Sequence, residues 1–429
     1  MGQVGIPFGG KKRSLTIPDK NLAVVFDPPF PPPMKDLSGE IMRALDQPAA
    51  GPPFSEGIGR GKRVLILIDN FARLTPAHRI LPPILEKIRK TGARVEILVA
   101  SGALREMNEA ELRTKLGREI LESGIPLSQS RCRDSWDFDF IGVTNFGTPL
   151  NLHRKLLQAD FSLAVTMTQA TLWGYGGGGS MVLPGVAAYE TIEWNHRLTT
   201  GPYSGLGYQP PKNLMRQDIE EAAGRSGLSM SLLVILRPDL QIIEITAGET
   251  NAACRASVAK YDRYYTLDRG SIPGGMLDIA ISGSFPGDRF FAHSCWAAAN
   301  LDFFTKEGGT IILAAPAPGG LAHYAYAKDY MPPDGNAFRR LYQDIFYGQQ
   351  PLWHACLWVP ILQVLAKKEI IVVTEERNLP AFQQVHLPAV TSLEQALTRA
   401  LKKHGPRARV GVFPYGKWVL PRGLNEGKT

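Results

Sequence analysis

The sequence predicts an α/β fold made of two domains. Continuous apolar runs, such as 64–68, 161–167 and 309–315, alternate with segments of helical periodicity, and this is the pattern of parallel strands covered on both faces. A chain of 429 residues, 44% hydrophobic and 21% charged, is long enough for two or three such units. We therefore expect parallel or mixed sheets with an active-site cleft between the two domains.

The first domain is expected to cover residues 1–268. The proline-rich segment 27–34 is typical of an extended, stiff connector. Asn108 and Glu111 have the spacing of a capping box at the start of a helix. The predicted elements are a hairpin over 6–17, strands at 22–26, 64–68, 95–100, 161–167, 231–236 and 241–246, and helices at 37–46, 80–91, 108–116, 186–196 and 217–226.

The second domain is expected to cover residues 269–429. The glycine- and proline-rich stretch 269–275 has the composition of a linker and marks the predicted boundary. Strands are predicted at 277–284, 309–315, 370–374 and 410–413, and helices at 288–304, 359–367 and 392–403.

A glycine-rich stretch at 173–180 follows the strand at 161–167. Because glycine has no Cβ, backbone N–H groups here can approach a phosphate or a flat cofactor closely. The Walker pattern fails because no lysine precedes Ser180, and the dinucleotide spacing fits only because a run of glycines fits almost any glycine pattern. We interpret the stretch as a ligand-binding loop, and the alternative is a flexible surface loop. The four consecutive glycines are Gly176, Gly177, Gly178 and Gly179.

Polar residues also follow the strand at 64–68. The carboxyl ends of strands are where open α/β sheets bind ligands, so this segment is a second candidate site. Arg73 can pair with a carboxylate or a phosphate through two parallel hydrogen bonds. The alternative is that Asp69 and Thr75 only cap the helix that follows.

Charge and cysteine content limit the kinds of ligand and the compartment that we expect for this protein. The net charge of +8 is spread along the chain, which favours a small anionic ligand, a substrate or a nucleotide, over nucleic acid. No apolar run reaches the roughly 18 residues of a membrane span. The cysteines are scattered without a close pair, which favours reduced thiols in a cytoplasm over disulfides or a zinc knuckle. A homo-oligomer is left open.

Five segments together resemble the nickel-pincer lactate racemase family. They are 69–76, 101–105, the glycine loop through 185, 190–196 and 285–288, and their order matches over essentially the whole chain. The resemblance implies two α/β domains with the active site between them. It also implies a nickel pincer nucleotide tethered to a lysine of the glycine loop, with nickel bound by a histidine. In the family a hydride leaves the α-carbon of a 2-hydroxy acid and later returns to it, while two histidines carry the hydroxyl proton.

Three positions agree with the family pattern. His196 stands at the nickel-binding histidine, and neutral imidazole is a suitable nickel ligand. Arg73 stands where an arginine faces the substrate, and Asp288 matches an acidic residue that opens a helix of the second domain. On that helix His293 and Trp296 replace the family's glutamine and lysine.

We assign roles on this basis. Arg73 and His293 are the candidate catalytic residues, and His196 is the candidate metal ligand. The alternatives are that His293 is a packed helix histidine and that His196 is a capping or core histidine. The candidate cofactor-binding residues outside the four glycines are Asn70, Thr75, Ser180, Asp288 and Trp296.

Three positions depart from the family pattern. Ser180 replaces the tethering lysine, and Leu104 and Ala170 replace the two proton-transfer histidines. Losing a general acid or base typically lowers the reaction rate by a factor of about 10² to 10⁴. Because Ser180 has no amine to form the tether, a nickel pincer nucleotide would have to bind noncovalently here. Otherwise no cofactor is expected.

Three functions follow from this pattern. The first is a diverged racemase or epimerase for a 2-hydroxy acid other than lactate, with Trp296 in an apolar wall that admits a bulkier substrate. The second is a nucleotide- or organic-acid-binding paralogue that has lost the family chemistry. The third is a structural paralogue that partners an active relative.

Overall fold

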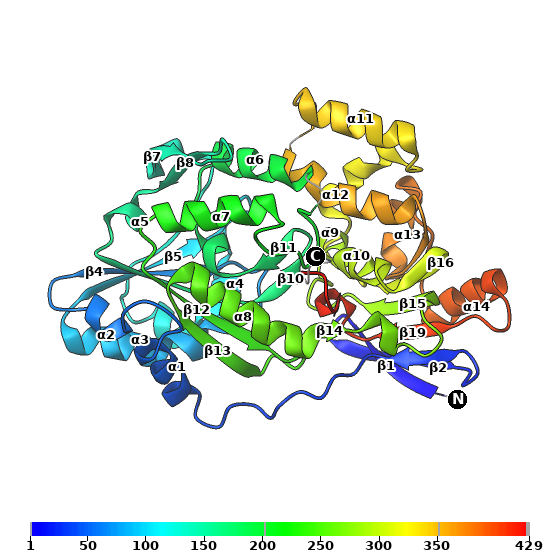
Figure 1. Ribbon diagram of the computed structural model, residues 1–429, viewed down its shortest axis with the longest axis horizontal. Helices are drawn as coiled ribbons and strands as arrows, with labels where there is room; N and C mark the ends of the chain where they lie inside the picture. Colours follow the sequence, from blue (N-terminus) through cyan, green and yellow to red (C-terminus); the bar gives the residue numbers. More distant parts are fainter. Residues whose placement is uncertain (1, 201–202, 351, 426–429) are drawn as a thin grey trace.

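Two six-stranded sheets organise the molecule (Figure 1). The structure is a computed structural model that describes residues 2–200, 203–350 and 352–425. Helices cover the faces of both sheets, so the predicted α/β class is confirmed. Within the part of the chain that is described, no helix is both long and apolar enough to cross a membrane. The cysteines are free thiols.

The first sheet has the strand order β13-β12-β9-β4-β5-β6. Its strands are β4 (Arg63–Asp69), β5 (Arg94–Ala100), β6 (Leu127–Gln129), β9 (Phe161–Met167), β12 (Met230–Leu236) and β13 (Ile242–Gly248). All pairings are parallel except that of β13 with β12. Side chains of β4 from Val64 to Ile68 are at most 1% exposed. A continuous apolar run is therefore explained by burial on both faces of the sheet.

Helices cover this sheet on both sides. On one face lie α1 (Leu37–Asp46), α3 (Ala77–Thr91) and α8 (Thr250–Tyr265). On the other lie α5 (Arg154–Gln158), α6 (Tyr189–Arg197) and α7 (Leu214–Arg225). The helix α4 (Glu109–Leu121) packs against α3, and its φ at Gly117 is 76°, so it is kinked there. The capping box of Asn108 and Glu111 is confirmed.

The second sheet has the order β18-β17-β16-β15-β19-β3, and every pairing in it is parallel. Its strands are β3 (Leu22–Val25), β15 (Leu277–Gly283), β16 (Thr305–Ala314), β17 (Glu369–Val373), β18 (Ala389–Val390) and β19 (Val410–Phe413). Around it lie α9 (Phe291–Ser294), α10 (Trp296–Asp302), α11 (Gly335–Phe346), α12 (Leu352–Leu365), α13 (Leu379–Gln384) and α14 (Leu393–His404).

The amino-terminal strands belong to this second sheet. The hairpin of β1 (Gly2–Phe8) and β2 (Lys11–Ile17) buries Ile6, Leu15 and Ile17 against β15 and β16, and β3 pairs with β19. The proline-rich connector then runs from the second sheet to the first (Figure 1). The boundary at residue 269 stays a prediction, but residues 2–25 do not pair with the sheet of the first domain to which we assigned them.

Short elements complete the chain. They are α2 (Phe54–Gly57), the hairpin of β7 (Phe138–Val143) and β8 (Pro149–His153), the hairpin of β10 (Gln169–Thr171) and β11 (Gly174–Gly176), and the pair β14 (Thr266–Leu267) and β20 (Leu420–Pro421). The 3₁₀ helices include short turns at Gly178–Met181 and Gly416–Trp418 and a longer one at Ala322–Tyr330.

The predicted helix at 288–304 is wrong in its first part. The chain is helical only from Phe291, and Asp288 precedes the helix without opening it. The carbonyl groups of Asp288 and Arg289 accept hydrogen bonds from Ala317 and Gly319, at 3.0 and 2.8 Å. These bonds hold Asp288 and Arg289 in a turn ahead of the helix, and a local sequence pattern does not reveal them.

Candidate functional site

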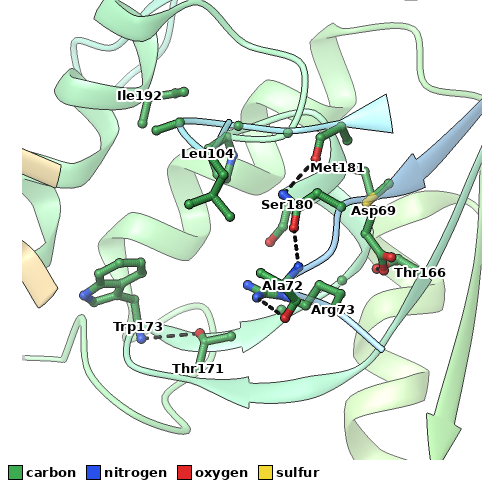
Figure 2. A pocket seen from close by; sticks show the side chains of 18 of the residues that line it. Asp69, Ala72, Arg73, Leu104, Thr166, Thr171, Trp173, Ser180, Met181 and Ile192 are labelled. Atoms are coloured by element: carbon green, nitrogen blue, oxygen red, sulfur yellow. Dashed lines mark hydrogen bonds between the residues drawn. The ribbon is translucent and has the colours of Figure 1, made fainter. Parts of the chain in front are cut away.

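A cavity of about 160 Å³ lies at the carboxyl ends of β4, β5 and β9 (Figure 2). The first half of the chain contributes the loops that follow these strands and part of α6 and α7, and the second half contributes His293, Trp296 and Leu357. The cavity thus lies between the two sheets, at the strand ends where open α/β sheets bind ligands. In Figure 2, Leu104 and Trp173 lie across the cavity from Ser180 and Arg73.

Most of the predicted site residues meet at this cavity. Those that line it are Asn70, Arg73, Gly176, Gly177, Ser180, His196, His293 and Trp296. Thr75, Gly178, Gly179 and Asp288 are not part of its lining. The assignment of ligand binding to these last four has no support from their placement.

Thr75 belongs to a buried polar network behind the cavity wall. Its hydroxyl donates to the Asp69 carboxylate, which also accepts from Thr166 Oγ1 at 2.8 Å and from Lys115 Nζ at 2.7 Å. The same ammonium donates to the Arg73 carbonyl at 2.7 Å. Helix α3 has Pro76 as its N-cap and no side-chain cap, so the alternative that Asp69 and Thr75 cap it is wrong. The network instead fixes the loop that carries Arg73.

Both the nitrogen and the oxygen of the Asn70 side-chain amide form hydrogen bonds within the protein. Its Nδ2 donates to the carbonyl of Ser101 at 3.1 Å, and its Oδ1 accepts from Ala72 N at 2.9 Å. The side chain therefore joins the loops after β4 and β5. Asn70 positions the cavity wall rather than offering a free amide to a ligand.

The guanidinium group of Arg73 has few partners. The hydrogen bond found for it goes to the carbonyl of Ala72 at 3.3 Å, and among the described residues no carboxylate lies within 4.0 Å of it. Burial lowers the pKa of Arg73 and the Asp69 charge opposes that shift, but an arginine keeps its proton in proteins. A partly buried charge without a close counter-ion can anchor an anionic ligand.

Close packing against β9, α7 and α8 explains why glycine occupies positions 177–179. A Cβ at Gly177 would lie 2.9 Å from the Met167 carbonyl oxygen, and its φ is 99°. At Gly178 and Gly179 a Cβ would meet Cys254 at 2.9 Å and Ile219 at 3.1 Å. The loop is thus neither flexible nor wholly turned toward the cavity. Gly178 and Gly179 serve close packing.

Ser180 has a basic partner that sequence reasoning missed. Arg216, on α7, donates from Nη1 to Ser180 Oγ at 2.8 Å. Arg216 is only 8% exposed and lines the cavity. One sequence feature could have pointed to Arg216. It lies on the same face of α7 as Met215 and Ile219, and that face is buried.

His196 is buried and neutral. Its Nδ1 lies 2.8 Å from the Ile192 carbonyl oxygen, so Nδ1 carries the proton and Nε2 has the free lone pair. Burial lowers the pKa of His196 to about 4. The Trp173 ring packs edge-on at 5.1 Å. A neutral imidazole with one free nitrogen suits a metal, although no group of three or more histidine, cysteine or acidic residues that could bind a metal occurs in the described ranges.

The second half of the chain adds an aromatic wall. The His293 ring lies 5.6 Å from that of Trp296, and both line the cavity. Lys417, a second residue that sequence reasoning missed, places its Nζ 4.5 Å from the centre of the Trp296 ring. Burial, with a contribution from Arg73, lowers the pKa of Lys417 to about 7. No local pattern in the sequence marks this lysine.

The residues present do not fit a tethered pincer nucleotide. Ser180 has no amine, and its Oγ is already bound by Arg216. Leu104 lines the cavity with an aliphatic side chain, and Ala170 is buried in β10 outside the lining. A hydroxyl proton therefore has no carrier at either position. Noncovalent binding of the nucleotide, with His196 as ligand, stays a prediction.

Comparisons with known proteins agree with this architecture. Residues 8–207 match the family described as lactate racemase N-terminal domain. The lactate racemase of Thermoanaerobacterium thermosaccharolyticum is 24% identical over 433 residues, spanning 98% of this chain and 100% of the relative. The lactate racemase of Lactiplantibacillus plantarum is 27% identical over 391 residues, spanning 89% of this chain and 90% of the relative.

Solved structures share the fold. The apoprotein of the Thermoanaerobacterium thermosaccharolyticum lactate racemase superposes with a TM-score of 0.88 at 22% identity, covering 98% of this chain and 100% of that one. A structural-genomics protein from Thermotoga maritima superposes with a TM-score of 0.67 at 16% identity, covering 89% and 97%. Residues 8–207 therefore match the lactate racemase N-terminal domain, and the chain is lactate racemase-like over nearly its whole length.

Proposed function

We propose that this lactate racemase-like protein binds a small organic acid in the cavity between its sheets, by its carboxylate, without catalysing the family's racemisation of lactate. The observation that carries the proposal is Arg73, whose guanidinium lines the cavity with no carboxylate within 4.0 Å among the described residues. A carboxylate bound through two hydrogen bonds would neutralise this charge.

The absence of proton carriers separates this proposal from the family reaction. Leu104 and Ala170 cannot accept a hydroxyl proton, and Ser180 cannot tether the nucleotide. Each missing acid or base typically lowers a rate by about 10² to 10⁴. Binding needs none of these groups, because Arg73 offers a charge for the carboxylate and Leu104 and Met181 offer apolar side chains in the same lining.

A second candidate is a racemase or epimerase for a larger 2-hydroxy acid. It is favoured by one observation, namely that His293 and His196 line the same cavity as Arg73. Of the two histidines, His293 is only partly buried and is the better proton carrier, since His196 has a pKa of about 4. The nickel pincer nucleotide, bound noncovalently, would supply the hydride acceptor that this chemistry requires.

Calorimetric titration of 2-hydroxy acids, other carboxylic acids and mononucleotides tests the first proposal. We expect at least one carboxylate to bind, and R73Q to weaken it about 10- to 100-fold, the loss of a charge-assisted pair. R113Q removes an exposed arginine that pairs with Glu109, and it serves as the matched control with unchanged binding. Binding that R73Q leaves unchanged would contradict the proposal.

Chiral chromatography distinguishes the two candidates. Protein produced together with the enzymes that make the pincer nucleotide is incubated with single enantiomers of 2-hydroxy acids. The binding proposal predicts no interconversion by wild type. Interconversion that H293Q abolishes, with substrate affinity retained, would establish the racemase instead.

A further inference from the structure

Arg216 is a second arginine of the cavity, and it is more deeply buried than Arg73. It lies on the inward face of α7, is 8% exposed, and donates to Ser180 Oγ at 2.8 Å. In the described ranges no carboxylate lies within 4.0 Å of its guanidinium. The Ser180 hydroxyl and the Cys254 thiol are hydrogen-bond partners of the guanidinium, but neither carries a charge that would balance it.

The acidic groups nearest to Arg216 in the sequence are engaged elsewhere. Asp218 accepts hydrogen bonds from Thr144 and Thr148, at 2.6 and 2.8 Å, and from Asn195 at 2.7 Å. Glu220 pairs with Arg255. The Cys254 thiol, which lies close to Arg216, has a pKa raised by burial and is therefore neutral. Glu220 acts on Arg216 only from beyond 4.0 Å, so no carboxylate in the described ranges pairs directly with this charge, and an anionic ligand can do so.

The two guanidinium groups reach the cavity from different elements. Arg73 comes from the loop after β4 and Arg216 from α7, and both belong to the lining. Aliphatic side chains complete the wall, among them Leu104, Met181 and Ile192. Two cationic anchors in one apolar cavity match a short carbon chain that carries an anionic group at each end.

Other lining groups still have hydrogen-bonding capacity. Ser101 Oγ and Trp296 Nε1 are buried and have no hydrogen-bond partner among the described residues. Buried polar atoms are nearly always paired in folded proteins, so such orphans indicate a missing partner. A ligand rich in oxygen atoms can satisfy donors of this kind.

We propose that the cavity is built for an organic dianion, a 2-hydroxy dicarboxylic acid, with one carboxylate on Arg73 and the other on Arg216 and Ser180. This inference rests on the proposed binding of an organic acid and specifies its class. It makes lactate, which has a single carboxylate, a poor ligand for this chain. The serine in place of the family's lysine leaves room for the second carboxylate beside Arg216.

The test compares acids that differ by one charge. Malate, lactate and 2-hydroxybutyrate share the 2-hydroxy acid group, and 2-hydroxybutyrate controls for the longer carbon chain. We expect malate to bind about 10- to 100-fold more tightly than either monocarboxylate, the contribution of one charge-assisted pair. Equal affinity of malate and 2-hydroxybutyrate in calorimetric titration would overturn the inference.

Variants locate the second carboxylate. R216Q should lower malate affinity to that of 2-hydroxybutyrate and leave the monocarboxylates unchanged, whereas R73Q weakens all three acids. R216K keeps the charge and should retain part of the malate preference, and it serves if R216Q does not fold. An equal loss for mono- and dicarboxylates in R216Q would refute the assignment. If no acid binds to wild type, the proposed function fails and this inference fails with it.

Discussion

Lys417 is a buried lysine whose charge state depends on the fold. It is 4% exposed, and burial lowers its pKa from the ordinary 10.5 to about 7. Between these values the unfolded chain keeps a proton on the amine that the folded chain has lost. Lys417 therefore makes the free energy of unfolding rise with pH across this window, by up to about 1.4 kcal/mol per unit.

Replacing this lysine by methionine should flatten that dependence. K417M keeps much of the side-chain volume and removes the amine, so the slope between about pH 7 and pH 10 should fall, with higher stability near pH 8. Urea titrations across the range measure it. K402M, at an exposed position, is the control and should keep the wild-type slope. A K417M slope equal to that of wild type would show that Lys417 is charged in the folded protein.

The ion pair of Asp69 and Lys115 supports the cavity from behind. Both side chains are at most 6% exposed, and Lys115 Nζ also donates to the Arg73 carbonyl. K115M leaves a buried carboxylate without its cation, so we expect it to lower the free energy of unfolding by about 3 to 5 kcal/mol. The double variant D69N/K115M removes both charges and should recover part of the loss. Chemical denaturation measures both, and no recovery in the double variant would contradict this account.

At the level of single residues, the sequence predicted side chains that stand in recognisable motifs. Arg73, His196 and His293 all reach the cavity because their segments follow strands or belong to helices that point to one sheet edge. Arg216 and Lys417 were missed because their importance comes from burial and from neighbours distant in the sequence. Neither property has a local pattern.

Among the elements, the glycine loop has a conformation that leaves little room for side chains at several positions. Gly177 has φ of 99°, and a Cβ there would lie 2.9 Å from the Met167 carbonyl oxygen. G177A should therefore destabilise the protein by about 1 to 3 kcal/mol. Gly224, in α7, has open space around the Cβ position, so G224A should stabilise by about 0.5 to 1 kcal/mol. Thermal and urea unfolding of G177A and G224A measure the change in the free energy of unfolding. An equal change in both variants would contradict the argument from backbone strain.

Elements with strong periodicity were predictable, and those without it were not. The apolar strand β9 was predicted with its observed bounds, whereas helix α8 was missed entirely. Buried positions of α8 are Thr250, Ala253, Ser257, Val258, Tyr261 and Tyr265, so its inward face mixes small polar and large side chains and lacks a continuous apolar stripe. The segment after Asp288 was taken as helix because pairing with residues 317–319 is a tertiary effect.

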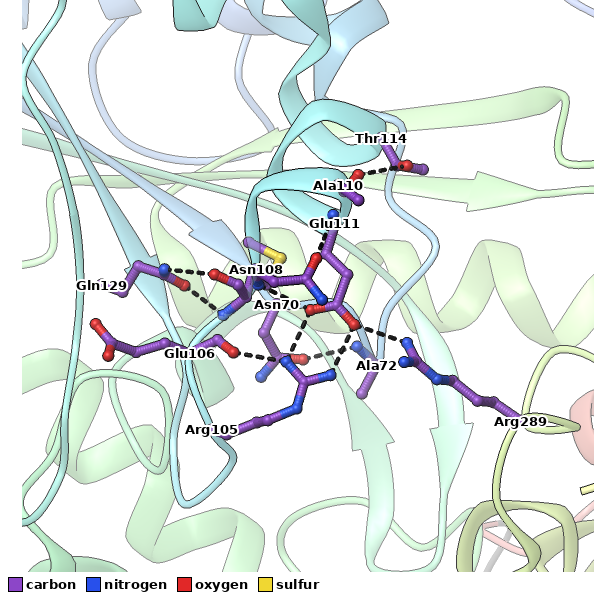
Figure 3. Close-up of polar contacts among 11 residues, drawn as sticks. Asn70, Ala72, Arg105, Glu106, Asn108, Ala110, Glu111, Thr114, Gln129 and Arg289 are labelled. Atoms are coloured by element: carbon purple, nitrogen blue, oxygen red, sulfur yellow. Dashed lines mark hydrogen bonds and ion pairs between the residues drawn. The ribbon is translucent and has the colours of Figure 1, made fainter. Parts of the chain in front are cut away.

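The pairing of distant segments decides the arrangement of the whole molecule. Nothing local in residues 22–25 reveals that this strand joins β19, at the edge of the second sheet. The same holds for the polar contact between the two halves of the chain (Figure 3). There Glu111, in the first turn of α4, binds Arg105 at 2.7 and 2.8 Å and Arg289 at 2.7 Å. Arg289 follows Asp288, ahead of the helices of the second half.

This contact should stabilise the packing of the two halves of the chain against each other. The hydrogen bond from Arg105 is the main cause that lowers the pKa of Glu111 to about 2, and Arg289 contributes. The stabilisation is present above the ordinary pKa of 4.5 and is lost as the pH falls toward 2. Glu111 is only 12% exposed, although both arginines are about half exposed, so solvent screens part of the attraction.

E111Q isolates this contribution, because glutamine keeps an oxygen for the capping box with Asn108 and loses only the charge. We expect a loss of about 1 kcal/mol in the free energy of unfolding at low salt, shrinking near 1 M NaCl, where the Debye length is about 3 Å. E109Q, which breaks an exposed pair with Arg113 inside one helix, should change stability by less than about 0.5 kcal/mol. Equal effects of E111Q and E109Q would mean that the contact between the halves is a surface pair without energetic weight. A larger, salt-sensitive loss in E111Q would show that the pairs of this carboxylate with Arg105 and Arg289 stabilise the fold.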